Sequence, residues 1–218
     1  MKKITLVFLF LSIVIISSFA QDDLNKIKGD WKSIQLGDSN EVVLSKLQYL
    51  ENSNAIGEYG VFDNFANEKR YCILVQGIPM FEKDLASGSL NFTSDKKLYS
   101  IILSFNTYPE NLLSTTIKEQ IYNKIKPMFI KLYGKTKESH KFPTTFDIET
   151  NKTYLTDIWE LKQKNNVKRV SIGISRIESS DYYCAEISIT DLLLNEKNMK
   201  DQDDKLNDNI DKSSTDFN

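Results

Sequence analysis

The chain has 218 residues, of which 40% are hydrophobic and 27% are charged, a balance typical of a globular protein. Its 28 basic and 30 acidic residues give a formal net charge of -2, so no basic surplus is present to neutralise a phosphate backbone, and we expect no nucleic-acid partner. One histidine and two cysteines exclude most zinc sites, and we expect neither a bound metal nor another cofactor.

The first 20 residues have the pattern of a signal peptide. Residues 1–3 (MKK) are basic, and the apolar run at 4–16 is shorter than the roughly 20 residues that span a bilayer. Small residues at Ser18 and Ala20 predict cleavage after Ala20, with an uncleaved N-terminal anchor as the alternative. We therefore expect an exported protein, periplasmic or secreted, with no stable membrane anchor after cleavage.

Composition divides the remaining chain into a domain and a tail. Residues 195–218 hold few large apolar side chains among many acids, amides and lysines, and cannot bury enough surface to offset the entropy of ordering. The aspartates in this segment do not have the spacing of an EF-hand calcium loop. We expect a disordered polar tail at 195–218 and a single domain at 21–194.

The first part of the domain predicts a helix followed by strands. Asp38 and Glu41 form a possible capping box at the start of the helix. The helix then carries one apolar stripe, which consists of Val43, Leu47 and Leu50. Strands rich in β-branched and aromatic residues are predicted at 70–76, 90–93 and 99–106, with a turn at 94–97.

The same order returns in the second part of the domain. Thr116 and Glu119 form a second possible capping box, and one helical face carries Ile121, Ile125, Met128 and Leu132. Pro127 predicts a kink or break near Lys126, and Gly134 predicts the end of the helix. A long loop at 135–152 precedes three further predicted strands, at 154–161, 167–177 and 182–190.

These elements predict an α+β fold of two similar units, at about 31–106 and 112–190. Each unit is a helix plus an antiparallel meander, and together they form a sheet with the helices packed on one face. The stretch 34–39 (IQLGDS), with Val42, Val43 and Leu47, resembles the helix-entry pattern of exported bacterial repeats of the β-lactamase-inhibitory-protein type and the outer-membrane-assembly-lipoprotein type.

That resemblance implies a protein-binding scaffold and, for the inhibitor type, two units joined into one concave sheet. The chain departs from the lipoprotein type because no lipid-bearing cysteine stands near residue 20. The resemblance therefore implies no membrane anchoring here, and no functional residue is carried over from either family.

No catalytic constellation is evident, and we assign no catalytic residue. His140 is the single histidine, and the chain has no Gly-x-Ser-x-Gly elbow for a serine triad. Both cysteines fall inside predicted strands, where nothing lowers a thiol pKa, and the pattern Ser94-x-x-Lys97 lies in a predicted turn. One enzymatic alternative stays open, a glycosidase-like secreted hydrolase that uses carboxylates, with candidate acids Asp147, Glu149, Asp157 and Glu160.

We therefore expect a binding or scaffold module of the cell envelope or the extracellular space, with a protein or a glycan as its partner. Aromatic residues and arginine contribute most at binding surfaces, and the predicted binding residues are Tyr182, Arg169, Trp159 and Tyr154. The alternative for the aromatic residues is a place in the hydrophobic core.

Alternation along the last two predicted strands indicates which side chains lie opposite the apolar row. On the last strand these are Tyr182, Cys184, Glu186 and Ser188, and on the strand before it they are Val167, Arg169, Ser171, Gly173 and Ser175. In an oxidising compartment Cys72 and Cys184 are predicted to form a disulfide, the alternative being two separately buried thiols.

Overall fold

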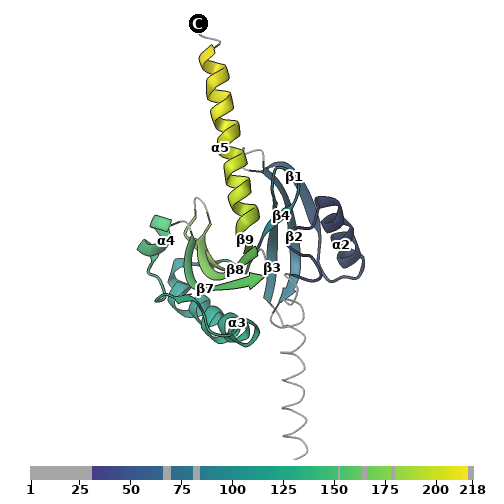
Figure 1. Ribbon diagram of the computed structural model, residues 1–218. Helices are drawn as coiled ribbons and strands as arrows, with labels where there is room; N and C mark the ends of the chain where they lie inside the picture. The colour runs from purple at the N-terminus through teal and green to yellow at the C-terminus, as the bar shows by residue number, and fades with distance from the viewer. Residues whose placement is uncertain are drawn as a thin grey trace, which may run out of the picture.

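The computed structural model describes residues 31–65, 70–80, 84–151, 153–163, 166–177 and 180–215. The predicted signal peptide at 1–20 and its cleavage site lie outside these residues. The described chain is a mixture of helices and an antiparallel sheet of nine strands, so the α+β prediction is confirmed (Figure 1). In this part of the chain, no helix is long and apolar enough to cross a membrane.

The elements follow one another in this order. Helix α2 (Asn40–Asn52) precedes strands β1 (Tyr59–Phe65), β2 (Arg70–Met80), β3 (Asp84–Phe92) and β4 (Leu98–Ser104). Strand β5 (Tyr108–Pro109) leads into a helical segment composed of η1 (Glu110–Leu112), η2 (Leu113–Ile117), η3 (Gln120–Ile125) and α3 (Lys126–Tyr133). The last elements are β6 (Glu138–Ser139), α4 (Thr145–Asn151), β7 (Thr153–Gln163), β8 (Asn166–Arg176), β9 (Tyr182–Asp191) and α5 (Leu192–Thr215).

The sheet has the strand order β1-β2-β3-β4-β9-β8-β7-β6, and the short β5 pairs with β9. All of these pairs are antiparallel. The centre of the sheet is the pair β4 and β9, which brings together strands about ninety residues apart in the chain. The sheet is therefore continuous from the first part of the chain to the second.

One face of the sheet is apolar from β2 to β7. A row of directly paired residues crosses six strands and consists of Ile73, Leu90, Ile101, Ile189, Val170 and Trp159. All of these side chains are buried, and they belong to one hydrophobic cluster with Val43 and Leu47 of α2 and Ile121 and Ile125 of η3. Burial of each such side chain contributes roughly 1.5–3 kcal/mol, so this apolar face is the main source of stability.

Helix α2 has the apolar stripe that its sequence predicts, because Val43, Leu47 and Leu50 are its buried residues. The predicted cap is wrong by one residue. Ser39 is the N-cap, since its backbone is extended and its hydroxyl accepts a hydrogen bond from the Val42 amide. Asp38 instead accepts a hydrogen bond from the Gln35 amide, and its carboxylate lies 2.7 Å from Lys46 Nζ.

The second capping box is also wrong, because Thr116 lies inside a helical segment that already begins at Glu110. The predicted irregularity at Lys126 is present. Wider π-helical turns end at Ile125 and a regular α-helix begins at Lys126, with Pro127 in its first turn, where the missing N–H costs nothing. Gly134 ends this helix with a positive φ of 77°, as predicted.

Residues 195–215 lie in helix α5, in place of the disordered tail predicted for 195–218. Polar contacts hold its first turns to the hairpin between β3 and β4. Lys197 Nζ lies 2.9 Å from Asp95 Oδ2, Ser94 Oγ donates to Asp201 Oδ2 at 2.9 Å, and Asn198 is only 5% exposed. Farther on, the helix runs away from the sheet (Figure 1). The composition of the segment carries no signal of such contacts, because their partners are about a hundred residues away.

Candidate functional site

The face of the sheet opposite the apolar face carries mainly small polar side chains, and we call it the polar face. Its residues on β4, β9 and β8 are Ser100, Ile102, Ser104, Tyr182, Cys184, Glu186, Ser188, Thr190, Arg169, Ser171, Gly173 and Ser175. The register pairs Ser175 with Cys184 and Ser171 with Ser188. The alternation predicted for the last two strands is thereby confirmed.

Hydrogen bonds between side chains connect the strands on the polar face. The hydroxyls of Thr153 and Ser175 are 2.8 Å apart, and Ser175 Oγ donates to Glu186 Oε2 at 2.7 Å. Farther along β9, Thr190 Oγ1 lies 3.2 Å from the Ser100 hydroxyl of β4 and 3.2 Å from that of Ser188. These bonds restrict the rotamers of the hydroxyl groups, and Ser100, Ser171 and Cys184 on this face are themselves buried.

Glu186 and Cys184 are the titratable groups near the middle of this network. Burial raises the pKa of Glu186, and the hydrogen bond from Ser175 opposes that shift only in part. Burial raises the pKa of the Cys184 thiol to about 12, with the nearby Glu186 charge acting in the same direction. The thiol is therefore not a nucleophile at neutral pH.

Arg169 lies toward the end of β8 that is next to α5, within a cluster of four charged side chains. Its Nη2 atom donates to Glu160 Oε1 at 3.2 Å, and Lys137 Nζ lies 2.8 Å from Glu160 Oε2. The hydrogen bonds from Lys137 and Arg169 lower the pKa of Glu160. Lys137 Nζ also lies 3.8 Å from Glu138 Oε1, so two carboxylates match the two basic side chains.

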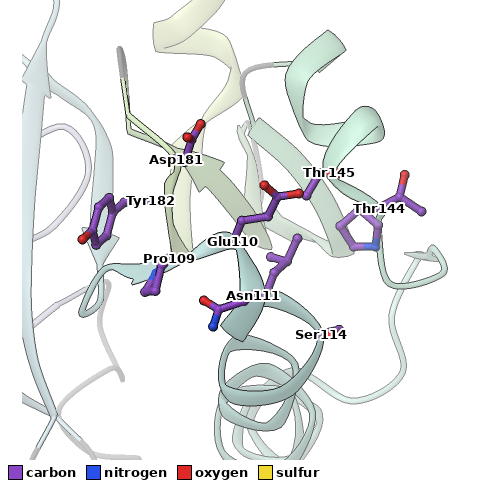
Figure 2. A pocket seen from close by; sticks show the side chains of 10 residues that line it. Pro109, Glu110, Asn111, Ser114, Thr144, Thr145, Asp181 and Tyr182 are labelled. Carbon is purple, nitrogen blue, oxygen red and sulfur yellow. The ribbon is translucent and has the colours of Figure 1, made fainter.

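Tyr182 lies at the opposite end of β9 and is 49% exposed. It lines an open pocket of about 690 Å³ between the start of η1, the loop before α4 and the turn before β9. Figure 2 shows this pocket, with Glu110 and Asn111 at the start of η1 and Thr144 and Thr145 across from them. No local pattern in the sequence indicates the pocket, because its walls come from three separate segments.

The four predicted binding residues do not lie together. Tyr182 and Arg169 share the polar face, but Trp159 and Tyr154 point to the apolar side, opposite Val170 and Ile174. Trp159 is 1% exposed, its Nε1 atom donates to the Gly134 carbonyl at 3.0 Å, and its ring packs on Phe129. The prediction that Trp159 lines a binding surface is therefore wrong.

A β-bulge between Leu155 and Asp157 explains why Tyr154 and Trp159 share a face. Five positions separate them, and a regular strand would place them on opposite faces. Tyr154 is half-buried, with its ring in an edge contact with that of His140. It therefore borders the core and is not part of the polar face.

The predicted disulfide between Cys72 and Cys184 is wrong. Both cysteines are free and buried. Both lie on the polar face, but β3 and β4 separate their strands, which places them roughly 14 Å apart across the sheet alone, against the roughly 4.4–6.8 Å between Cα atoms that a disulfide allows. The alternative of two separately buried thiols is the correct one.

The acids named for a hydrolase do not form a facing pair. Asp157 and Glu160 project from opposite faces of β7, opposite Ile172 and Arg169 respectively. Asp147 accepts hydrogen bonds from Thr144 at the start of α4, and Glu149 pairs with Arg176 at 3.4 Å. Each of these carboxylates thus has its own partner, and none faces a second acid across a cleft.

Ser139, Asp157 and Lys126 form a cluster that the sequence did not indicate. Ser139 Oγ donates to Asp157 Oδ1 at 2.7 Å, and Lys126 Nζ lies 2.7 Å from the same oxygen and 3.2 Å from the hydroxyl. A hydroxyl beside a carboxylate meets the first requirement of an activated nucleophile. However, the carboxylate is already paired with the Lys126 ammonium group. The cluster is best described as a buried ion pair.

In the part of the chain that the structure describes, no group of three or more histidine, cysteine, aspartate or glutamate side chains is placed to hold a metal ion. Among the described residues, the polar face and the pocket beside Tyr182 are candidate binding surfaces. No family model, no curated protein and no solved structure matches this chain.

Proposed function

We propose that this chain is an exported binding or scaffold module, periplasmic or secreted, and that it recognises its partner through the polar face. The observation that carries the proposal is the position of Tyr182 and Arg169 on this one face, near the two ends of the β8–β9 pair. Thr190, which pairs with Arg169, is eight residues from Tyr182, about 26 Å along the strand. A protein interface of ordinary size, about 800 Å² per partner, has this breadth.

We further propose that the domain consists of two similar units, as the sequence resemblance implies. The strand order supports this proposal, because β1 to β4 and β6 to β9 each form a meander, and the two meanders join through their last strands. A helix precedes each meander, α2 in the first unit and the segment from η2 to α3 in the second. In such an arrangement the polar face extends over both units without a break.

A protein is the partner that this surface suits best. Side-chain hydroxyls and one carboxyl occupy the centre of the polar face, while an aromatic ring and an arginine stand toward its ends. The partly exposed hydroxyls of Ser104, Ser175, Ser188 and Thr190 allow weak polar contacts between two stronger ones, as is usual in protein interfaces. The carboxylate-based hydrolase is not proposed, because no observation brings its acids together.

Site-specific photo-cross-linking in the cells that produce the protein tests the proposal. One photoreactive residue replaces Ser87, which is exposed and pairs with Ser104 on the polar face, and another replaces the exposed Lys131 of α3. We expect a cross-linked protein from position 87 and none from position 131. The variants Tyr182→Ala and Arg169→Ala should each weaken capture by about 2 kcal/mol, or roughly thirtyfold.

Cross-linking from position 131 alone, or from neither position, would overturn the proposed face. Loss of glycan hydrolysis in Asp157→Asn or Glu160→Gln would replace the binding function by an enzymatic one. Export is tested separately by mass spectrometry of the N-terminus. The mature protein should begin at Gln21, whereas an intact Met1 terminus would contradict the proposed export.

A further inference from the structure

The helical segment from η3 to α3 concentrates positive charge. Between Glu119 and Glu138 the chain has five lysines and no acidic residue, although the whole chain has a formal net charge of -2. The side of this segment that packs on the sheet is apolar, because the buried residues recur every four positions, at Ile121, Ile125 and Phe129. The lysines therefore lie on the other sides of the segment, toward solvent.

Exposed side chains form a stripe on the outer side of this segment, which we call the basic stripe. Its members recur every three or four residues, and they are Lys124, Pro127, Ile130, Lys131 and, just after the end of α3, Lys135. Lys126 and Lys137 have carboxylate partners and are not part of the stripe. Within the described part of the chain, no carboxylate is paired with Lys131 or Lys135, so the stripe presents uncompensated positive charge.

The basic stripe faces away from the polar face. Helix α3 lies on the apolar side of β7, where the ring of Phe129 is 5.8 Å from that of Trp159, and the stripe is on the outer side of this helix. Figure 1 shows α3 on one side of β7 and β8, with α5 extending away on the other. A partner that lies against the stripe therefore leaves both the polar face and α5 uncovered.

The composition of the stripe favours a surface that carries diffuse negative charge. All five basic residues between 119 and 138 are lysines, which act as flexible point charges, whereas the planar fork of arginine suits directed pairing with one carboxylate or phosphate. Ile130 is 44% exposed and lies between the lysines. Cations around an exposed apolar side chain suit a membrane surface, which has charged headgroups over an apolar layer.

We propose that the basic stripe rests reversibly on an anionic lipid surface, with its lysine ammonium groups at the headgroups and Ile130 inserted at the boundary with the acyl chains. Lys124 and Lys131 are seven residues apart, roughly 10 Å along the helix, so both lie within a Debye length of the same surface. The inference goes beyond the proposed function, because it concerns another surface and another class of partner. In this orientation the polar face is turned away from the membrane.

The test is co-sedimentation of the mature chain with vesicles. Vesicles of equal parts phosphatidylglycerol and phosphatidylcholine are compared with vesicles of phosphatidylcholine alone. We expect binding to the anionic vesicles at about 0.05 M salt, at least roughly tenfold weaker binding at about 0.5 M salt, and no binding to phosphatidylcholine alone.

Charge variants locate the surface. The triple variant Lys124→Gln/Lys131→Gln/Lys135→Gln should bind the anionic vesicles roughly a hundredfold more weakly, because each lysine near such a surface contributes about fivefold. The matched triple variant replaces three exposed lysines elsewhere by glutamine and has the same net charge, and its substitutions are Lys97→Gln, Lys162→Gln and Lys200→Gln. The matched variant should bind as the parent does.

A fluorescent label tests the orientation. Because Cys72 and Cys184 are buried, a polarity-sensitive thiol dye in the folded protein labels only the new cysteine of Ile130→Cys or of Ser87→Cys on the polar face. We expect anionic vesicles to shift the dye emission to shorter wavelength at position 130 and to leave it unchanged at position 87.

The proposal is overturned by equal binding of the two triple variants, by equal binding to both kinds of vesicle, by no binding, or by a dye shift at position 87. Binding to heparin as tight as to the anionic vesicles would also overturn it, since a soluble polyanion would then suffice. The cross-linking experiment captures a protein at position 87 without lipid. Failure of the lipid surface and failure of the proposed binding function therefore give different results.

Discussion

Lys126 Nζ lies 2.7 Å from Asp157 Oδ1, and this ion pair connects the start of α3 to β7. The Asp157 side chain is fully buried, and its second oxygen has no hydrogen-bond partner within the structure. The folded state can hold a carboxylate in such a buried place only if a cation is paired with it, because transfer of an unpaired charge out of water costs several kcal/mol.

Lys126→Met should therefore lower the free energy of unfolding by about 3 kcal/mol, since it leaves the Asp157 charge buried without its cation. Urea denaturation measures this change. Lys131→Met, at an exposed position of the same helix, should change stability by less than about 0.5 kcal/mol. The double variant Lys126→Met/Asp157→Leu should recover most of the loss, because it replaces both charges by apolar groups. Equal losses in the single and double variants would show that the loss does not come from the unpaired Asp157 charge.

Cys72 and Cys184 should behave as unreactive free thiols. Burial raises the pKa of both, in the case of Cys184 to about 12, so the thiolate is scarce at pH 8. A thiol reagent at pH 8 is expected to modify both cysteines only after the protein unfolds. Cys72→Ala should have the same relative stability under oxidising and reducing conditions. A disulfide-linked peptide in a non-reducing digest would contradict the separation seen in the sheet.

Glu186→Gln should stabilise the protein at neutral pH. The raised pKa of Glu186 means that the folded state holds this proton more tightly than the unfolded state does. The ionised carboxylate therefore opposes folding above its folded-state pKa, and this cost vanishes below the unfolded-state pKa of about 4.3. Urea denaturation across a pH series should show a gain in the free energy of unfolding at pH 7.5 that shrinks toward zero near pH 4. Glu119→Gln serves as the control and should show no such trend.

Gly134→Ala should lower the free energy of unfolding by about 2 kcal/mol, because a φ of 77° with a ψ of -151° suits glycine almost alone. A Cβ atom at this position would touch nothing within 4 Å, so the cost is one of backbone strain. The Gly134 carbonyl also accepts the hydrogen bond from Trp159 Nε1, and tryptophan fluorescence can follow the same denaturation. Lys135→Ala, at the next and exposed position, should be close to neutral. A neutral Gly134→Ala variant would show that the backbone relaxes here.

Local sequence patterns correctly predicted those features that depend on the geometry of a single helix or strand. The stripe of Val43, Leu47 and Leu50 and the stop at Gly134 follow from helix geometry over a few residues. The faces of β8 and β9 follow from the two-residue period of a strand, and the structure has Tyr182 and Arg169 on the side that this period predicts. These features need no information about distant parts of the chain.

Other predictions failed because they depend on where distant strands lie. The pairing of Cys72 with Cys184 was argued from their number and compartment, but the strand order inserts β3 and β4 between them. The aromatic residues of β7 were assigned to a surface, but one bulge places Tyr154 and Trp159 on the same side of the strand, which is the core side. A bulge adds one residue to one strand and leaves little trace in composition.

The sequence by itself determined the class of the fold, the helix that carries the first apolar stripe and the polar character of one face of the central strands. It did so because side-chain periodicity is a local property of each element. Only the tertiary structure decided the buried ion pair of Lys126 and Asp157, the anchoring of α5 on the hairpin at Asp95, and the pocket at Glu110 and Tyr182. Each of these joins segments far apart in the chain, and their contact depends on the strand order and register of the whole sheet.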